Sequence, residues 1–149
     1  MRVAIIGAGL QASRRAPAIK KSGDELVVIA AAHTESARRM SVLNGCDYAV
    51  GWEEVVDRED IEAVLICTPP STHFSIAMAA MRGGKHVLCE KPLAMNSKEA
   101  KKMVDLSVKS GRTLRCGFNH RYHPSLQEVK RSITSGELGE VYYMTASNC

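Results

Sequence analysis

The chain opens on Val3-Ala4-Ile5-Ile6-Gly7-Ala8-Gly9-Leu10-Gln11-Ala12, an apolar run that leads into a glycine-rich turn. In a turn of this kind the first glycine permits a tight bend and the second leaves room for a phosphate. The small residue at the end lets the next helix pack closely on the strand. The pattern therefore predicts a strand, a turn whose backbone can approach a pyrophosphate, and a helix. The residues that we assign to this ligand are Gly7, Gly9, Leu10, Gln11 and Ala12.

Short apolar runs alternate with amphipathic stretches along the next hundred residues. We expect strands at 3–6, 26–31, 48–50, 63–67, 86–89 and 113–116. We expect helices at 10–21, with Pro17 as a kink or late start, and at 35–43, 52–57, 71–81 and 98–110, the last capped by Ser97. The strands read as continuous apolar runs, which is typical of parallel strands buried on both faces. This order predicts an α/β fold, a doubly wound parallel sheet of the Rossmann type.

The pattern changes after Gly117. Residues 118–124 read as a polar, aromatic loop, 125–135 as an amphipathic helix, and 141–146 as a strand of β-branched and aromatic residues. Because no further strand follows in the chain, we expect this last one to open a second sheet. We therefore predict a dinucleotide-binding domain at 1–120 and, at 121–149, a linker helix and the first strand of a truncated second α/β domain.

Composition and charge exclude several classes of protein. Hydrophobic residues make up 45% of the chain and charged residues 24%, which is ordinary for a soluble globular protein. No apolar run approaches the roughly 18 residues of a membrane-spanning helix, and the apolar residues after Arg2 are too few for a signal peptide. The net charge of +4 comes from Lys and Arg scattered among Asp and Glu, so we expect neither nucleic acid nor a membrane as a partner.

The cysteines indicate the redox compartment. There are five, an odd number, and none stands in a Cys-x-x-Cys spacing. Cys67, Cys89 and Cys116 each end an apolar run, which is typical of small buried side chains in a reducing compartment. We therefore expect free thiols, no metal site and a cytoplasmic protein.

The end of the second strand bears on the choice of cofactor. An acidic residue there usually binds the adenosine ribose hydroxyls, but this chain has Ala31-Ala32-His33. Its absence removes an attraction for the unphosphorylated ribose and a repulsion of a 2′-phosphate, so we expect NADP to be tolerated at least as well as NAD. His33, Thr34 and either Arg38 or Arg39 can bind such a phosphate, and we assign Arg38. The alternative is that these are ordinary residues of the first helical turns.

Two later strands end in residues suited to nicotinamide chemistry. Thr68-Pro69-Pro70 closes the fourth strand, and its prolines stiffen a loop against a flat ligand. Glu90-Lys91-Pro92 follows the fifth strand; the Lys91 ammonium can polarise a substrate oxygen, and Glu90 can orient it. Open α/β sheets bind ligands at this edge, so we assign Thr68, Pro69, Pro70, His73, Glu90 and Lys91 to the cofactor site. The alternatives are a surface ion pair for Glu90 and Lys91 and a surface histidine for His73.

Four sequence blocks together resemble the N-terminal half of the Gfo/Idh/MocA family, which includes glucose–fructose oxidoreductase and inositol dehydrogenase. They are the turn at 7–12, the segment Ile61–Pro70 with Thr72 and His73, the segment Gly84–Leu93, and Gly117-Phe118-Asn119-His120-Arg121-Tyr122-His123-Pro124. The resemblance covers essentially the whole chain. S-adenosylmethionine, the rival ligand for a glycine turn after a first strand, has no use for the Glu-Lys-Pro block in register with the others.

The resemblance implies hydride transfer between NAD or NADP and a hydroxyl-bearing carbon of a sugar, inositol or related polyol. It implies a second domain built on an open antiparallel sheet, and a homo-oligomer for the full-length protein. Lys91 matches the family's catalytic lysine, which contacts substrate and nicotinamide, and we place Arg121 and Tyr122 on the substrate side. The family's acid–base histidine, four residues after an aspartate, would lie beyond residue 149. We therefore expect this chain to be the cofactor-binding half and to be inactive alone.

A non-catalytic dinucleotide-binding or sensing module is the alternative function. The predicted strand at 141–146 discriminates between the two, because a self-contained module has no reason to end on an unpaired strand.

Overall fold

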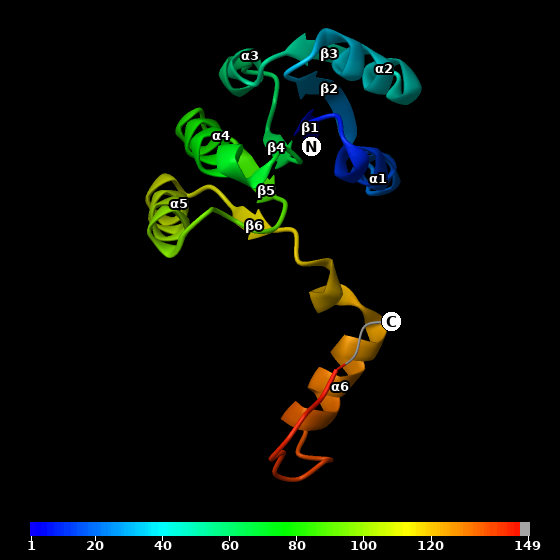
Figure 1. Cartoon of the computed structure of the whole chain (residues 1–149), viewed down its shortest axis with the longest axis vertical. Helices are drawn as coiled ribbons and strands as arrows, with labels where there is room; N and C mark the ends of the chain where they lie inside the picture. The colour runs from blue at the N-terminus through cyan, green and yellow to red at the C-terminus, as the bar shows by residue number, and fades with distance from the viewer. Residues whose placement is uncertain (147–149) are drawn as a thin grey trace. The chain divides into compact units, whose positions relative to one another are not determined.

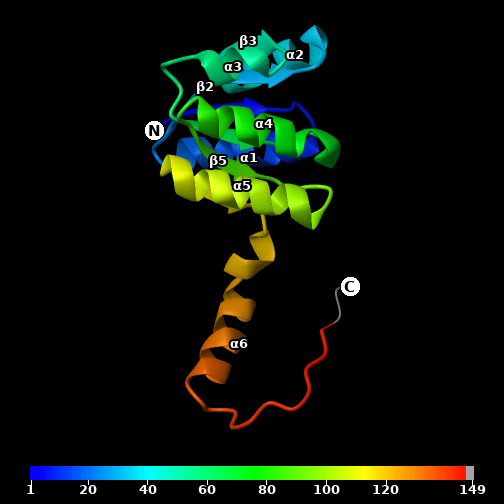
Figure 2. The same ribbon diagram turned by 90° about the vertical axis from the view of Figure 1, so that its left-hand side faces the viewer.

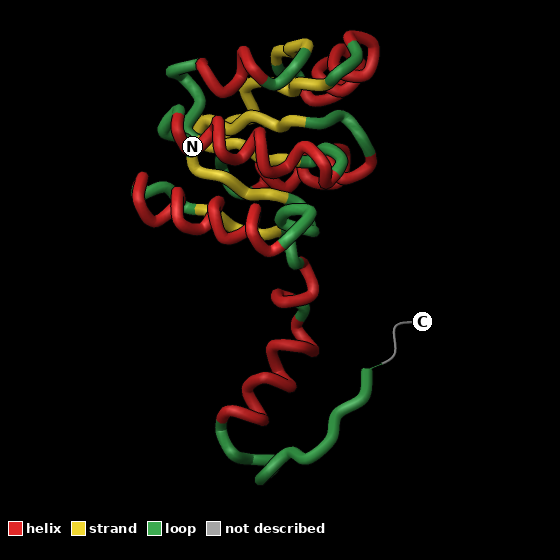
Figure 3. Tube along the Cα trace, turned by 60° about the vertical axis from the view of Figure 1, so that its left-hand side comes forward, coloured by secondary structure: helices red, strands yellow, loops and turns green. Residues whose placement is uncertain are grey.

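The first of two compact units in this computed structural model, Met1–Gly117, is built on a single parallel sheet (Figures 1 and 3). The structure describes residues 1–146. The six strands are β1 (Arg2–Ile6), β2 (Glu25–Ala31), β3 (Asp47–Val50), β4 (Ala63–Ile66), β5 (His86–Cys89) and β6 (Leu114–Cys116). Their order is β3-β2-β1-β4-β5-β6, and every neighbouring pair is parallel. The predicted α/β, doubly wound fold is confirmed.

Helices cover both faces of the sheet. They are α1 (Leu10–Lys21), α2 (Thr34–Asn44), α3 (Glu53–Asp57), α4 (Pro70–Arg82) and α5 (Ser97–Ser110). The core residues of α1 and α2 pack on one face and those of α3, α4 and α5 on the other, and Figure 2 shows α3, α4 and α5 in front of the strands. This division follows from right-handed crossovers. From β1 the chain crosses the sheet through β2 to β3, and from β3 it returns to β4 and continues to β5 and β6 in the opposite direction, so the two sets of helices lie on opposite faces.

The side chains of β1 alternate between the two covered faces of the sheet, which explains why the strand is an unbroken apolar run in the sequence. Val3 and Ile5 face α1 and α2, whereas Ala4 and Ile6 face the opposite layer. All four are buried. Burial of a Val or Ile side chain contributes about 1.5–3 kcal/mol, and that of an Ala less, so a strand covered on both faces gains stability at every position.

Several local details differ from the sequence-based expectations. Helix α1 runs without a break from Leu10 to Lys21, so Pro17 does not delay its start, and the proline ring is exposed. The expected cap at Ser97 is wrong: Asn96 caps α5, its side chain accepting a hydrogen bond from the amide of Glu99 at 2.9 Å. Asparagine satisfies a first-turn amide as well as serine does, so the helix begins one residue earlier than expected. The remaining boundaries of the predicted helices and strands up to residue 134 agree with the structure to within one residue.

The second unit begins at Phe118. Its described part contains the short 3₁₀-helix η1 (Asn119–Tyr122), where a loop was expected, and the helix α6 (Pro124–Thr134). The predicted strand at 141–146 is wrong, because these residues adopt neither helix nor strand. A strand is stabilised by hydrogen bonds to a neighbouring strand, and residues 141–146 have no such partner among the described residues.

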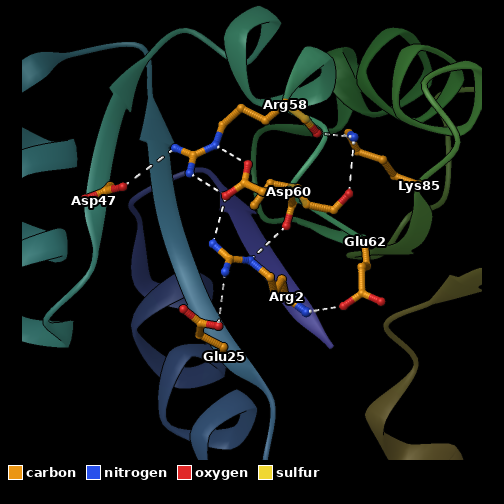
Figure 4. A network of polar contacts seen from close by, with 8 residues as sticks. Arg2, Glu25, Asp47, Arg58, Asp60, Glu62 and Lys85 are labelled. Carbon is orange, nitrogen blue, oxygen red and sulfur yellow. Dashed lines mark hydrogen bonds and ion pairs between the residues drawn. The ribbon is translucent and has the colours of Figure 1, made fainter.

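Charged residues join the strand starts at the amino edge of the sheet (Figure 4). The Asp60 carboxylate accepts hydrogen bonds from the guanidinium groups of Arg58 and Arg2, each at 2.8 Å. The Lys85 ammonium, which is buried, donates to the carbonyl oxygens of Arg58 and Ile61 at 2.6 and 3.2 Å. These contacts connect the segment before β4 to the start of β1 and to the segment before β5.

The network predicts a specific acid sensitivity. The hydrogen bond from Arg58 is the largest cause that holds the pKa of Asp60 below its ordinary value. A carboxyl group whose pKa is lower in the folded chain stabilises the fold above its unfolded pKa, and this contribution disappears as the pH falls. We expect Asp60→Asn to reduce the free energy of unfolding near neutral pH, and this loss to shrink below about pH 4.

Urea unfolding at a series of pH values measures this effect. Asp105→Asn, which removes an exposed pair with Lys101 on α5, is the matched control and should change little. An Asp60→Asn difference that stays constant down to about pH 2 would contradict the assignment.

Candidate functional site

The carboxyl ends of the central strands lie side by side at one edge of the sheet. Ile6 of β1 pairs with Ala30 of β2 and Ile66 of β4, and Cys89 of β5 pairs with Ile66 and with Cys116 of β6. The hydrogen bonds between neighbouring strands continue one residue beyond these strand ends. The amides of Gly7, Cys67, Glu90 and Gly117 each donate to a carbonyl group in the last two residues of a neighbouring strand, at 2.7–2.9 Å. The loops that carry the predicted site residues therefore start from fixed positions.

The turn after β1 requires glycine at Gly7. Its φ of +110° is one that other residues rarely adopt, and a β-carbon there would lie 2.6 Å from the carbonyl oxygen of Cys67. Gly9 differs, because a β-carbon there would have no atom within 4 Å. The first glycine is thus needed for folding, whereas the second leaves open space in front of α1.

The start of α1 suits an anionic ligand. Gly9 is the N-cap, no side chain caps the helix, and the first turn carries no acidic residue. The first amides of a helix lack partners within it, and together with the helix dipole they favour a phosphate. The space at Gly9 and these amides fit the pyrophosphate of a dinucleotide, as the sequence predicts.

The predicted adenosine end lies beside the start of α2. His33 is the N-cap of that helix and Thr34 its first residue, and both are exposed. Thr34 and Arg38 are four residues apart on the helix and so share one face, which favours Arg38 over Arg39. The first turn of α2 also contains Glu35. This acidic residue lies just after positions 31–33, where an acidic residue that binds the adenosine ribose is usual.

His73 joins the loops that follow β4 and β5. Its ring is fully buried, so the alternative of a surface histidine is wrong. Nδ1 lies 2.8 Å from the carbonyl oxygen of Pro92, and Nε2 lies 2.9 Å from that of Thr68. Both ring nitrogens are occupied by the backbone. His73 can therefore act on a ligand only through the Thr68–Pro70 loop and the loop that carries Lys91, both of which it holds in place.

Glu90 and Lys91 differ strongly in their surroundings. The Lys91 side chain is exposed, whereas Glu90 is 5% exposed. Glu90 accepts hydrogen bonds from Arg15 of α1, the Nε–Oε1 distance being 2.8 Å, and its Oε2 lies 3.4 Å from the amide nitrogen of Lys91. The alternative of a surface ion pair between Glu90 and Lys91 is wrong, because the cation that pairs with Glu90 is Arg15. Lys91 is exposed and is not the partner of Glu90 in this ion pair.

The thiols at this edge are unsuited to nucleophilic chemistry. Burial, and to a smaller extent the charge of Glu90, raises the pKa of Cys67 to about 12. Burial likewise raises the pKa of Cys89 to about 12. The four cysteines within residues 1–146 are free, and Cys149 lies outside the described residues. The described residues contain no group of three or more His, Cys, Asp and Glu side chains that could hold a metal ion.

A groove of about 540 Å³ lies on the side of the sheet that carries α1. It is lined mainly by apolar residues from the starts of β1, β4 and β5 and from the end of α1, and it includes Leu88, which is 41% exposed. Most of its lining lies far along the strands from Gly7 and Lys91. None of the predicted site residues lines the groove, although Arg15, which contacts Glu90 at the carboxyl edge, does.

Comparison with known proteins agrees with this geometry. The profile of an oxidoreductase family with an NAD-binding Rossmann fold, Gfo/Idh/MocA, matches residues 1–118. The chain belongs to this family. Within residues 1–146, no helix is both long and apolar enough to cross a membrane.

The relatives of this Gfo/Idh/MocA chain include sugar and inositol enzymes. Inositol 2-dehydrogenase 4 of Saccharopolyspora erythraea is 36% identical over 97% of this chain and 44% of its own length. D-glucoside 3-dehydrogenase of Escherichia coli is 30% identical over 98% of this chain and 42% of its own length. The crystal structure of KijD10, a 3-ketoreductase from Actinomadura kijaniata in complex with NADP and TDP-benzene, superposes with a TM-score of 0.85 at 29% identity. The superposition covers 91% of this chain and 42% of the KijD10 chain. This chain thus spans less than half the length of these relatives.

Some functional features escaped the sequence analysis. Arg15 is one of two adjacent arginines in α1, and nothing in the sequence distinguishes it from Arg14 or connects it with Glu90.

Arg121 and Tyr122, placed on the substrate side by resemblance, lie in the second unit, and Tyr122 is 71% exposed. Their role stays a prediction.

The two glycines of the turn predict opposite outcomes. Gly9→Val should abolish dinucleotide binding and leave the fold largely intact, because its side chain enters the open space that the phosphate needs. Gly7→Ala should instead destabilise the fold by about 2–4 kcal/mol through backbone strain and overlap with Cys67. Calorimetric titration and thermal unfolding of both variants test this. An unchanged affinity in Gly9→Val would exclude the turn from the binding site.

Proposed function

We propose that this chain is the cofactor-binding part of an NAD(P)-dependent dehydrogenase, which transfers hydride between nicotinamide and a hydroxyl-bearing carbon of a sugar, inositol or related polyol. The observation that carries the proposal is that an uncapped helix start behind Gly9 and the exposed Lys91 occur at the same edge of one parallel sheet. Ligands of open α/β sheets bind at this edge, where the strand order reverses.

The chain's residues divide the work between the two halves of the cofactor. The amides at the start of α1 bind the pyrophosphate, and His33, Thr34 and Arg38 face the adenosine end. The Thr68–Pro70 loop would form a wall for the flat ring of a nicotinamide, which would supply or accept the hydride when bound. The Lys91 ammonium donates a hydrogen bond to the substrate oxygen and stabilises the charge that develops on it.

The remaining parts of the enzyme lie outside this unit in the proposal. The residue that exchanges the hydroxyl proton, and most of the substrate pocket, belong to the portion of the relatives that this truncated chain does not span. Arg121 and Tyr122 contribute to the substrate side. The free thiols favour a cytoplasmic protein, and the family resemblance favours a homo-oligomer at full length.

A non-catalytic dinucleotide-binding or sensing module is the competing function. The predicted strand at 141–146, which would have argued against a self-contained binding module, is not formed. The preference for an enzyme therefore rests on the family, whose named relatives are dehydrogenases, and on Lys91, which the family resemblance makes a catalytic lysine.

The activity of the chain tests the proposal. The 149-residue chain should bind a nicotinamide cofactor and yet show no turnover with a panel of inositols and hexoses. A missing general base typically costs about 10²–10⁴-fold, and the loss of substrate positioning costs more. The measurements are calorimetric titration with NAD, NADH, NADP and NADPH, and absorbance of the reduced nicotinamide. Absence of cofactor binding would refute the proposal, and robust turnover would refute the division between the two parts.

Cofactor choice gives a second test. NADP should bind at least as tightly as NAD, since no acidic side chain stands at 31–33. Arg38→Gln should weaken NADP about tenfold, or 1.4 kcal/mol, and leave NAD unchanged, with Arg39→Gln as the matched control. A hundredfold preference of the unmodified chain for NAD, about 2.7 kcal/mol, would show that another residue excludes the 2′-phosphate.

A further inference from the structure

The buried carboxylate of Glu90 connects the phosphate turn with the loop that carries Lys91. Arg15, on the second turn of α1, donates to Glu90 Oε1 from Nε at 2.8 Å and also from Nη2. Seventy-five residues separate the two in sequence. Helix α1 begins directly after the turn that faces the pyrophosphate, and Glu90 directly precedes Lys91, so this one ion pair links the two functional segments.

The surroundings of Glu90 hold its carboxylate in a single place. A β-carbon on Gly117, just after β6, would lie 3.0 Å from Oε2, which is tighter than an ordinary contact, so a side chain there would press on the carboxylate. Oε2 also lies 3.4 Å from the Lys91 amide nitrogen. The charge of Glu90 also contributes to the raised pKa of Cys67, which directly follows β4. The ends of three strands and one helix thus converge on this group.

The energetics of the pair indicate a role in geometry rather than in net stability. The side chains of Glu90 and Arg15 are 7% and 23% exposed, so both charges lose much of their hydration. Replacing such a pair by well-packed apolar residues is often neutral or stabilising, whereas removing one partner is costly. What a charged pair adds is direction, because a guanidinium and a carboxylate bind only in a narrow range of orientations.

Building on the proposed function, we infer that Arg15 and Glu90 are positioning residues that fix the backbone of Lys91 relative to the phosphate turn. A ligand that occupies only the turn does not require this alignment. A complete dinucleotide requires it, because its nicotinamide end must reach the Lys91 loop while its pyrophosphate stays on α1. The pair therefore acts on the affinity for the dinucleotide and spares the affinity for its adenosine half.

Two ligands of different length test the inference. The unmodified chain, Glu90→Gln and Arg15→Met are titrated with NADPH and with 2′-phospho-ADP, and in parallel with NADH and ADP. We expect each substitution to weaken the dinucleotides about tenfold, while the fragments change less than about twofold. Arg14→Met, on the exposed neighbour of Arg15, is the matched control and should change neither affinity.

Further variants separate positioning from damage to the fold. The double variant should lose no more affinity than either single one, because both remove the same interaction. Arg15→Lys, which keeps a charge and a donor, should recover part of the dinucleotide affinity, and it replaces Arg15→Met if that variant does not fold by circular dichroism.

The outcomes distinguish the inference from the proposed function. Equal losses for dinucleotide and fragment, or additive losses in the double variant, would overturn the positioning role and leave the proposed function standing. Absence of binding of all four ligands to the unmodified chain would overturn both.

Discussion

The close approach of Gly7 to the carbonyl group of Cys67 is the constraint on which the binding edge depends. A β-carbon at Gly7 would lie 2.6 Å from that oxygen, closer than a side chain permits. The contact joins the ends of β1 and β4, the two strands at which the sheet order reverses. It therefore fixes the turn from which α1 starts. In open α/β sheets this reversal point is where a ligand binds.

The two edges of the sheet use charge in opposite ways. At the amino edge Arg2 and Arg58 both pair with Asp60, and the Lys85 ammonium is bound by carbonyl groups, so charge there supports the fold. At the carboxyl edge the start of α1 has no side-chain cap and Lys91 is exposed. These donors are available to a ligand. In the proposed function, charge thus supports the sheet at one end of the strands and serves a ligand at the other.

The sequence predicted the fold and the location of the edge, because both depend on local patterns. Apolar runs mark the parallel strands, and the spacing of Gly7, Gly9 and Ala12 marks the turn. What it could not predict are partners brought together from distant segments: the pairing of Arg15 with Glu90 and the contacts of His73 with Thr68 and Pro92. The strand expected at 141–146 failed for the same reason, since strand formation depends on a neighbour that local sequence does not specify.

The central claim is that one ligand spans the edge from the phosphate turn to Lys91. Two-dimensional amide NMR of the ¹⁵N-labelled chain during titration with NADPH tests it most directly. The account predicts that the largest shifts fall on two separated groups of amides, residues 7–12 and residues 90–91, and that both saturate with one affinity. Shifts confined to the groove beside Leu88, or shifts at residues 7–12 without any at Lys91, would contradict it.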